Sequence, residues 1–324
     1  KLRTGVSDSK IYQKLSDVIR GPMILTIGFI MSITNYMTID VEDYYQVSAF
    51  EKISPPSTWA GRESRVERNT DLILAILDEA SIKATFFVLG WVAEHCPGLV
   101  KLIAAQGHEI ASHGYGHQRL CNMTRDAFRE DVRRSKSLLE DATGQQVYGY
   151  RAPSYSISRD TLWAFDELYE AGYLYDSSIF PIRHDYYGIP DWQRFAGPAV
   201  KVTDNDWQPG EALNGEKTIM ELPITTLQIA GMNFPIAGGG YFRLLPYELT
   251  KLGLQSINRK EEQSFVFYLH PWEFDPEQPR MAGAGWKSNF RHYLNLDKTA
   301  GRFGRLLNDF SFGTILDGLK LKPS

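Results

Sequence analysis

Residues 84–117 read ATFFVLGWVAEHCPGLVKLIAAQGHEIASHGYGH, and this stretch decides the fold class. Its first seven residues are rich in β-branched and aromatic side chains and end at a glycine, as a buried strand does. A helical segment over 91–106 follows, which is interrupted at Pro97 and stopped by Gly107. Residues 108–112 then form a second short apolar run. A strand, a helix and another strand in this order predict a parallel sheet or a β/α barrel.

The same alternation continues on both sides of this stretch. We expect strands at 37–41, 147–150, 220–227 and 264–270, helices at 69–80, 124–143, 158–172 and 246–258, and a short basic helix at 299–307. From about 181 to 243 the pattern loosens and becomes rich in Gly, Pro and aromatic residues. Functional groups in α/β folds lie at the carboxyl ends of strands, so polar clusters that follow strands are the candidates for a site.

Composition excludes several classes of protein. The 324 residues are 43% hydrophobic and 13% aromatic, which fits a globular chain. Lys plus Arg number 35 against 39 Asp plus Glu, and a net charge of −4 does not favour a nucleic-acid binder. Cys96 and Cys121 form no CxxC pair, which rules out a disulfide framework and a Cys-type zinc site, and we expect free thiols.

The N-terminal region contains an apolar run, PMILTIGFIMSI, at 22–33. A membrane-spanning helix needs about 20 apolar residues, so this run is short for one. It has the length of a signal-peptide core, but no small-x-small cleavage site follows. The run fits a weak membrane anchor, a buried first strand or an extension outside the functional domain, and we favour the last two.

Two polar clusters contain groups that bind metals. The first predicted strand ends in Asp40, and Glu42 and Asp43 follow it; three acids so close together are tolerated in water or around a bound cation. Strand alternation points Asp40 and Glu42 to the same side. His113 and His117 lie four residues apart, so in a helix or turn both imidazoles can bind one metal such as zinc.

Two further clusters supply groups for acid–base chemistry. Arg151 lies in YRAPSYS (150–156), where a proline fixes the turn and the guanidinium can hold a carboxylate. His270 lies at the end of the strand SFVFYL, which suits proton transfer. Each cluster alone is explained about as well by a structural role. Together they supply everything that metal-assisted hydrolysis requires.

The order and spacing of these motifs resemble the polysaccharide deacetylases of the NodB-homology type, carbohydrate esterase family 4, over residues 37–272. The motifs of that family are similar here to TIDVEDYY (38–45), HGYGH (113–117), RAPSY (151–155) and YLH (268–270). The chain looks most like a bacterial subgroup encoded with exosortase and exopolysaccharide systems. The features that resemble this subgroup are DVEDYYQV (40–47), RAPSYS (151–156), GGGYFR (238–243), HPWEFDP (270–276) and FRHYLNL (290–296).

The resemblance implies an α/β fold, a distorted (β/α) barrel with an additional C-terminal region. It implies an N-terminal extension at 1–36 and a deacetylase domain at 37–272. The second half of that domain, from about 181, merges with a subgroup-specific region. Residues 273–318 then form a C-terminal subgroup-specific segment.

The resemblance also implies roles for the acids and the histidines. In the family the first acid of the opening motif is the general base and the second is a metal ligand. We therefore expect Asp40 as the base, and Asp43 as a ligand of a divalent metal, zinc by preference, together with His113 and His117. Glu42 remains the alternative ligand or base.

The other motifs of the family imply the rest of the mechanism. Arg151 orients the base, His270 protonates the leaving amine, and a backbone N–H near Tyr155 stabilises the oxyanion. Tyr155, Tyr241 and Trp272 are the expected substrate-binding residues. Trp192 and Trp207 are further candidates for a sugar groove.

The expected activity is the metal-dependent removal of N-acetyl groups from amino sugars of a bacterial exopolysaccharide. The partner is then a polysaccharide and not a nucleic acid, and the compartment is cytoplasmic or membrane-peripheral, with the periplasm as the alternative. Three other functions compete with this one. They are an allantoinase-like hydrolase of cyclic amides on the same barrel, a metal-dependent oxygenase and a non-catalytic glycan-binding module.

Overall fold

The strand that ends in Asp40, β1, is central to the sheet. It runs over Thr34–Val41 and pairs in parallel with three strands, β2 (Thr85–Val88), β11 (Val266–Leu269) and β12 (Ser311–Gly313). Because β1 begins at Thr34, the expected boundary at residue 36 falls inside this strand. Asp40, Glu42 and Asp43 therefore lie at the end of a strand that is hydrogen-bonded to other strands on both sides.

The protein is described by a computed structural model over residues 33–184, 187–211 and 215–321. The apolar run at 22–33 lies outside the described residues except for its last member, so the three interpretations of it stay predictions. Within the described ranges, no helix is both long and apolar enough to cross a membrane. Cys96 and Cys121 are free thiols, as expected.

The strands form an open-edged barrel. The remaining strands of the main sheet are β3 (Glu109–Ser112), β4 (Gly149–Tyr150), β5 (Tyr175–Asp176), β6 (Gly197–Thr203), β7 (Asp206–Pro209) and β8 (Thr218–Glu221). Their order is β11-β1-β2-β3-β4-β5-β8-β6-β7, parallel from β11 to β8 and antiparallel beyond. The segment that follows β8 lies beside the start of β11, where the Val266 N–H donates to Thr225 Oγ1 at 2.8 Å, and this contact brings the two sides of the sheet together. This arrangement confirms the α/β fold class and the distorted barrel.

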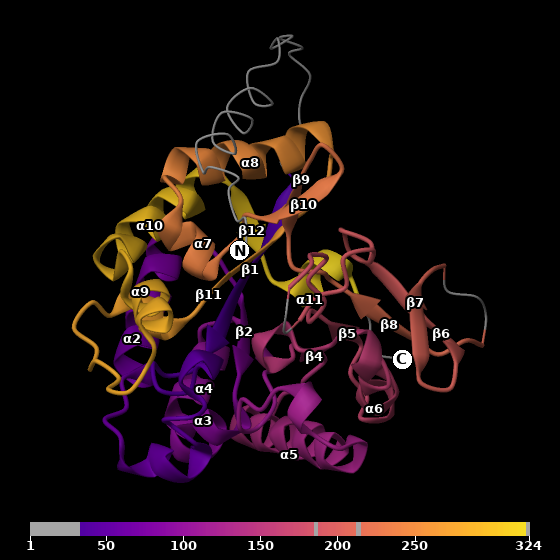
Figure 1. Cartoon of the computed structure of the whole chain (residues 1–324), viewed down its shortest axis with the longest axis horizontal. Coiled ribbons are helices and arrows are strands. Elements are labelled where there is room, and N and C mark those ends of the chain that lie inside the picture. Colours follow the sequence, from indigo (N-terminus) through magenta and orange to yellow (C-terminus); the bar gives the residue numbers. More distant parts are fainter. Residues whose placement is uncertain (1–32, 185–186, 212–214, 322–324) are drawn as a thin grey trace, which may run out of the picture.

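Helices cover the outside of the sheet (Figure 1). They are α2 (Val66–Glu79), α3 (Gly90–His95), α4 (Pro97–Ala105), α5 (Arg125–Thr143), α6 (Ala164–Glu170), α7 (Gly239–Leu244), α8 (Tyr247–Lys260), α9 (Trp286–Tyr293), α10 (Thr299–Asp309) and α11 (Ile315–Leu319). Short 3-10 turns connect them, of which η1 (Ser48–Phe50), η4 (Pro153–Tyr155), η6 (Pro271–Phe274) and η7 (Leu296–Lys298) border the site or support it. Thr124 caps α5 and Gly144 ends it with φ +68°, as expected.

One expected strand is divided in the structure. The segment 220–227 forms the end of β8 and the start of β9 (Thr226–Ile229), which pairs with β10 (Met232–Pro235) in a separate hairpin. Pro223 lies at the break, and proline cannot donate to a ladder. The single apolar run predicted from the sequence therefore supplies two sheets.

Alternation along β1 decides which groups face the barrel interior. Met37, Ile39 and Val41 belong to the large core under the helices, while Tyr36 belongs to a second cluster inside the barrel with Phe87. Asp40 lies an even number of residues from Tyr36 and so points inward at the carboxyl end of the strand.

The C-terminal segment closes the opposite, amino end of the barrel. β12 pairs with the start of β1, and Ile315 joins the interior cluster. The Leu316 N–H donates to the partly buried Glu109 carboxylate at 3.1 Å, and Tyr175 Oη donates to the same group at 2.6 Å. Residues beyond 273 are therefore part of the barrel's packing.

Two buried carboxyl groups face each other where β5 pairs with β8. Asp176 and Glu221 are register partners, and both are fully buried. Burial raises the pKa of Asp176 to about 6, and burial together with the neighbouring Asp176 raises the pKa of Glu221 well above its ordinary value. The pair holds the next loop, because Asp176 accepts from the Ser178 N–H and Glu221 accepts from the Ile179 N–H.

We predict that Glu221→Gln reduces the pH dependence of stability. Above the ordinary carboxyl pKa the folded pair retains a proton that the unfolded chain has lost, so the free energy of unfolding falls with rising pH, by about 1.4 kcal/mol per pH unit for one proton. A glutamine amide can donate to Asp176 without titrating, so the fall should shrink. Urea unfolding from about pH 5 to about pH 8 measures this. The exposed Glu79→Gln is the control, and equal slopes in all three proteins would contradict the shared proton.

Candidate active site

The four motifs converge on one pocket at the carboxyl end of the barrel. The pocket has a volume of about 230 Å³. Its walls come from the loops after β1, β3 and β4, from the end of β11 and from one residue of the loosely patterned region, and they comprise Asp40, Glu42, Val47, Ser48, Ala49, His113, His117, Ser154, Tyr155, Tyr187, Tyr268, His270 and Trp272. The parallel strands explain this, because their carboxyl ends meet at one edge.

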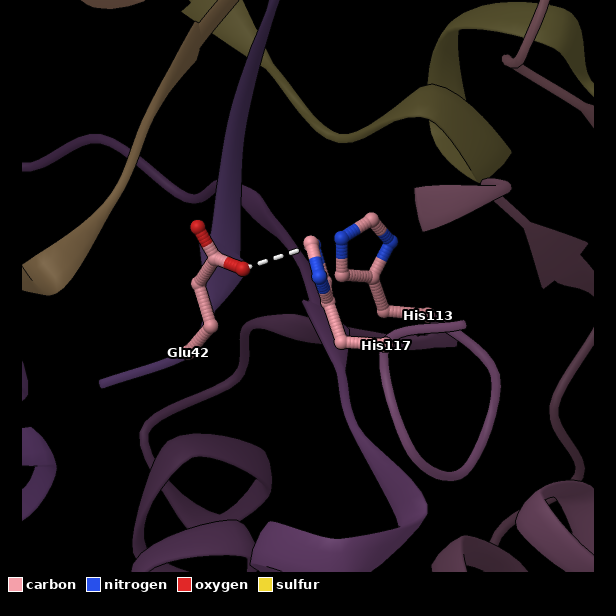
Figure 2. Close-up of side chains that lie close together, drawn as sticks. All are labelled: Glu42, His113 and His117. Atoms are coloured by element: carbon pink, nitrogen blue, oxygen red, sulfur yellow. Dashed lines mark ion pairs between the residues drawn. The ribbon is translucent and has the colours of Figure 1, made fainter. Parts of the chain in front are cut away.

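Glu42, His113 and His117 form a three-residue group that could hold a metal ion (Figure 2). One potential ligand atom from each lies within 4.8 Å of the others, and all three side chains are buried. His117 Nε2 lies 2.7 Å from Glu42 Oε2. His113 Nδ1 donates to the Arg151 carbonyl at 2.8 Å, which leaves its Nε2 lone pair available to a ligand.

The protonation states of this group fit a metal. Burial alone would raise the pKa of Glu42, but the adjacent His117, with His270 and His113, lowers it below the ordinary carboxyl range. Burial lowers the pKa of His113 to about 4. In the part of the chain that the structure describes, His117 Nδ1 is buried without a hydrogen-bond partner, and His117 Nε2 lies close to Glu42 Oε2. An ionised carboxylate beside a neutral imidazole is the ligand state that zinc and similar ions require.

The structure places Asp43 elsewhere, which corrects its expected position beside the imidazoles. Its Oδ2 accepts from the backbone N–H of Arg65 at 2.7 Å and of Val66 at 3.1 Å, and from Ser64 Oγ at 2.9 Å. These donors lie at the start of α2, where free N–H groups attract a carboxylate. The carboxylate that accompanies the two histidines is Glu42, which strand alternation had placed on the same side as Asp40.

Asp40 is held by Arg151 at the centre of the site. Arg151 Nη1 lies 2.6 Å from Asp40 Oδ1, and both side chains are buried. The same guanidinium donates to Thr38 Oγ1 and to the carbonyl and hydroxyl oxygens of Ser177, and it stacks 4.0 Å above the Phe87 ring. Asp40 therefore keeps one oxygen for the pocket, in a fixed orientation.

His270 faces the same carboxylates from β11. Its Nε2 lies 3.9 Å from Asp40 Oδ2 and 3.6 Å from Glu42 Oε1, and its Nδ1 lies 2.6 Å from Glu273 Oε1. Burial alone would lower the pKa of His270, but the hydrogen bond to Glu273 and the nearby Glu42, Glu273 and Asp40 charges raise it to about 9. A protonated imidazole in this position can donate from Nε2.

Glu273 is a site residue that the sequence reasoning missed. It is fully buried and accepts from both the backbone N–H and Nδ1 of His270. The available signal was its position three residues after His270 in HPWE, which matches a capping box at the start of η6.

The expected substrate-binding residues have different surroundings. Trp272 lines the pocket, and its Nε1 donates to Glu42 Oε1 at 3.1 Å. Tyr155 also lines it, edge-on to Tyr268 at 5.1 Å between ring centroids. Tyr241 is half-buried and is not among the residues that line this pocket.

The structure also bears on two other expectations. The Tyr155 backbone N–H itself donates to the Ala152 carbonyl at 3.0 Å, so an oxyanion donor near Tyr155 stays a prediction for the other N–H groups of this loop. Trp192 and Trp207 are buried against Phe165 in the core, which removes them from a sugar groove.

The loop that carries the two histidines has its own support. Asp131 on α5 accepts from the Tyr115 N–H at 3.0 Å and lies where a side chain on Gly114 would be. Gly114 has φ +72° and His117 has φ +50°, so the turn needs residues that tolerate left-handed backbone. The turn thus brings His117 back toward His113.

Comparison with known proteins gives two adjacent matches. Residues 58–173 match the polysaccharide deacetylase family model, and residues 177–320 match a domain of unknown function (DUF3473). Arg151 and the histidine pair lie in the first match, and His270 and Glu273 lie in the second. The pocket is therefore built from both regions and from β1, which precedes them.

Curated relatives are similar over part of their length. The peptidoglycan-N-acetylglucosamine deacetylase of Bacillus cereus is 35% identical over 99 residues, which is 30% of this chain and 36% of that protein. The peptidoglycan deacetylase of Helicobacter pylori is 26% identical over 151 residues, which is 47% of this chain and 50% of that protein. The chain thus spans between about a third and a half of these relatives.

A solved structure supports the fold over most of the chain. A protein described as a putative polysaccharide deacetylase from Mycobacterium smegmatis superposes with a TM-score of 0.56 at 20% identity, covering 93% of this chain and 96% of that one. The barrel fold is thus shared. In sequence, residues 58–173 are similar to polysaccharide deacetylases, and part of the chain is similar to peptidoglycan deacetylases.

We predict that Glu42→Gln weakens metal binding and that the equivalent change Asp43→Asn does not. Loss of an outer partner already costs about 10- to 100-fold in metal affinity, so loss of a ligand should cost at least as much. Competition of each variant with a chelating indicator for zinc measures the affinity. The ligand assignment is wrong if Asp43→Asn loses the metal while Glu42→Gln keeps it.

Proposed function

We propose that this protein is a metal-dependent hydrolase that removes N-acetyl groups from the amino sugars of a polysaccharide. The observation that carries the proposal is the placement of two opposed proton-transfer groups around one ligand set. Asp40, held by Arg151, and His270, held by Glu273, line the same pocket as Glu42 and the two histidines. A base, an acid and a metal site within one pocket are what amide hydrolysis needs.

Glu42, His113 and His117 would hold a divalent metal, whose chemistry is to polarise the acetyl carbonyl and to lower the pKa of water. Asp40 then accepts a proton from the attacking water through the oxygen that Arg151 does not occupy. Arg151 keeps this carboxylate oriented. His270 Nε2 donates its proton to the departing amine, and acetate and a free amino sugar result.

Two imidazoles and one carboxylate are a common ligand set of catalytic zinc, which supports zinc as the metal. The aromatic walls, Tyr155 and Trp272 among them, suit the apolar faces of a sugar ring. Relatives named as acting on peptidoglycan support an N-acetylglucosamine-type unit. The subgroup resemblance, which includes the GGGYFR and HPWEFDP motifs, supports a bacterial exopolysaccharide as the polymer.

The compartment stays a prediction, with cytoplasmic or membrane-peripheral placement favoured over the periplasm.

The first test is acetate release from N-acetylglucosamine oligomers and from native exopolysaccharide, with metal-loaded and chelated protein side by side. We expect release from the loaded protein only. A protein that binds metal but releases no acetate from either polymer would overturn the proposal, and activity on cyclic amides would replace it with the allantoinase-like alternative.

Asp40→Asn should keep the metal and lose most of the activity. Removal of a general base typically costs about 10²- to 10⁴-fold in rate, whereas the metal ligands are untouched. Metal content and kcat are measured on the same preparation. If this variant were nearly as active as the parent, Asp40 would not be the base.

A further inference from the structure

We propose that Arg243, in the region of unknown function, is a positioning residue that holds the catalytic acid His270 in place through the buried Glu273 carboxylate. This inference rests on the proposed function, because it assigns His270 the role of acid. It gives part of residues 177–320 a specific task in the active site. Arg243 lies 27 positions before His270 in the chain, and the fold brings the two onto opposite sides of one carboxylate.

Glu273 has a fixed donor at each oxygen. Oε1 accepts from His270 Nδ1 at 2.6 Å and from the His270 N–H at 3.1 Å. Oε2 accepts from Arg243 Nε at 2.6 Å. Because both oxygens are engaged, the carboxylate cannot rotate without breaking a buried, charge-assisted hydrogen bond. The orientation of the His270 ring therefore depends on Arg243.

Arg243 is itself clamped by backbone carbonyls. Its Nη1 donates to the carbonyl of His292 at 2.9 Å and to that of Leu294 at 2.8 Å, between α9 and η7. Its guanidinium lies 5.2 Å from the ring centroid of Trp272, a wall of the pocket. Its side chain is only 2% exposed and that of Glu273 is fully buried. The C-terminal segment thus fixes the position of the arginine.

The glycines before Arg243 explain how α7 comes so close to β11. Gly238 has φ +103°, and a Cβ there would lie 2.1 Å from the Tyr268 carbonyl oxygen. A Cβ on Gly239 would lie 2.8 Å from the Tyr268 ring. Only glycine allows this approach, and Tyr268 lies two residues before His270. The motif GGGYFR therefore contains both the glycines that pack against Tyr268 and the arginine that this close packing brings to Glu273.

A buried ion pair of this kind is weak evidence for stability, because desolvation offsets much of the attraction. The ion pair matters more for the orientation of Glu273 and His270 than for the stability of the fold. Without Arg243, the Glu273 carboxylate would be free to turn or to take up a proton, and the imidazole would lose its fixed partner. We therefore expect the effect in catalysis and in the hydrogen bond to His270.

The experiment compares Arg243→Gln, Glu273→Gln and the double variant, with Arg194→Gln as the matched control. Arg194 is another mostly buried arginine of the same region, paired with Glu261 and with the Thr226 carbonyl. We expect Arg243→Gln to lower kcat by about 10- to 100-fold with little change in KM or metal content. The double variant should be no slower than Glu273→Gln alone.

A readout that does not need a substrate accompanies the kinetics. The proton between His270 Nδ1 and Glu273 should give a downfield NMR signal in the parent and in Arg194→Gln, assigned by its loss in His270→Gln. We expect this signal to be lost or displaced in Arg243→Gln. If that variant did not fold, Arg243→Lys would keep the charge but could not reach both carbonyls and Glu273, and should show the same change to a smaller degree.

The two readouts distinguish the possible failures. If the parent released no acetate, the proposed function would fail, and the NMR signal would still decide the role of Arg243. An unchanged signal in Arg243→Gln would overturn the inference. Multiplicative losses of kcat in the double variant would also overturn it, because they would mean that Arg243 acts independently of Glu273. An equal loss in Arg194→Gln would overturn it as well, because it would indicate a general effect on stability.

Discussion

The buried ion pair between Arg151 and Asp40 is the constraint on which the site depends. Its two members come from β1 and from the loop after β4, and the charged groups are 2.6 Å apart with almost no exposure. A buried arginine must have its donors satisfied, and here Thr38 and Ser177 supply the remaining acceptors. The carbonyl of the same arginine accepts from His113 Nδ1, which fixes the free nitrogen of that histidine. One residue thereby orients both the proposed base and a candidate metal ligand.

A second residue of the pocket, His270, is held by a buried charged partner in the same way as Asp40. His270 is fixed by Glu273 as Asp40 is fixed by Arg151, and Glu273 is in turn held by Arg243. The first half of this arrangement lies in β1 and the polysaccharide deacetylase match, and the second lies in the domain of unknown function. The two matches are therefore parts of one site. The C-terminal segment supports this site through the carbonyls that bind Arg243, and its Ile315 packs into the interior of the barrel.

Much of this architecture could be predicted from the sequence, because strand and helix periodicity is a local property. The alternation around 84–112, the caps of α5 and the break at Pro97 all correspond to the structure. The strand predicted at 220–227 failed because one apolar run with a central proline feeds two sheets, which periodicity cannot reveal. The Asp43 assignment failed for a non-local reason: its partners are the N–H groups of α2, more than 20 residues away. Strand alternation continued past the end of β1 did predict that Glu42 lies on the same side as Asp40. Arg243 could not be assigned at all, since its partners Glu273, His292 and Leu294 meet it only in the fold.

The central proposal is that Glu42, His113 and His117 would hold a divalent metal in the pocket that Asp40 and His270 also line. Anomalous diffraction at the zinc edge from crystals of the zinc-loaded protein tests it most directly. The account predicts one strong peak within bonding distance of these three side chains, with Asp43 still bound to the start of α2. A peak beside Asp43, or a zinc-loaded crystal with no peak in this pocket, would contradict it.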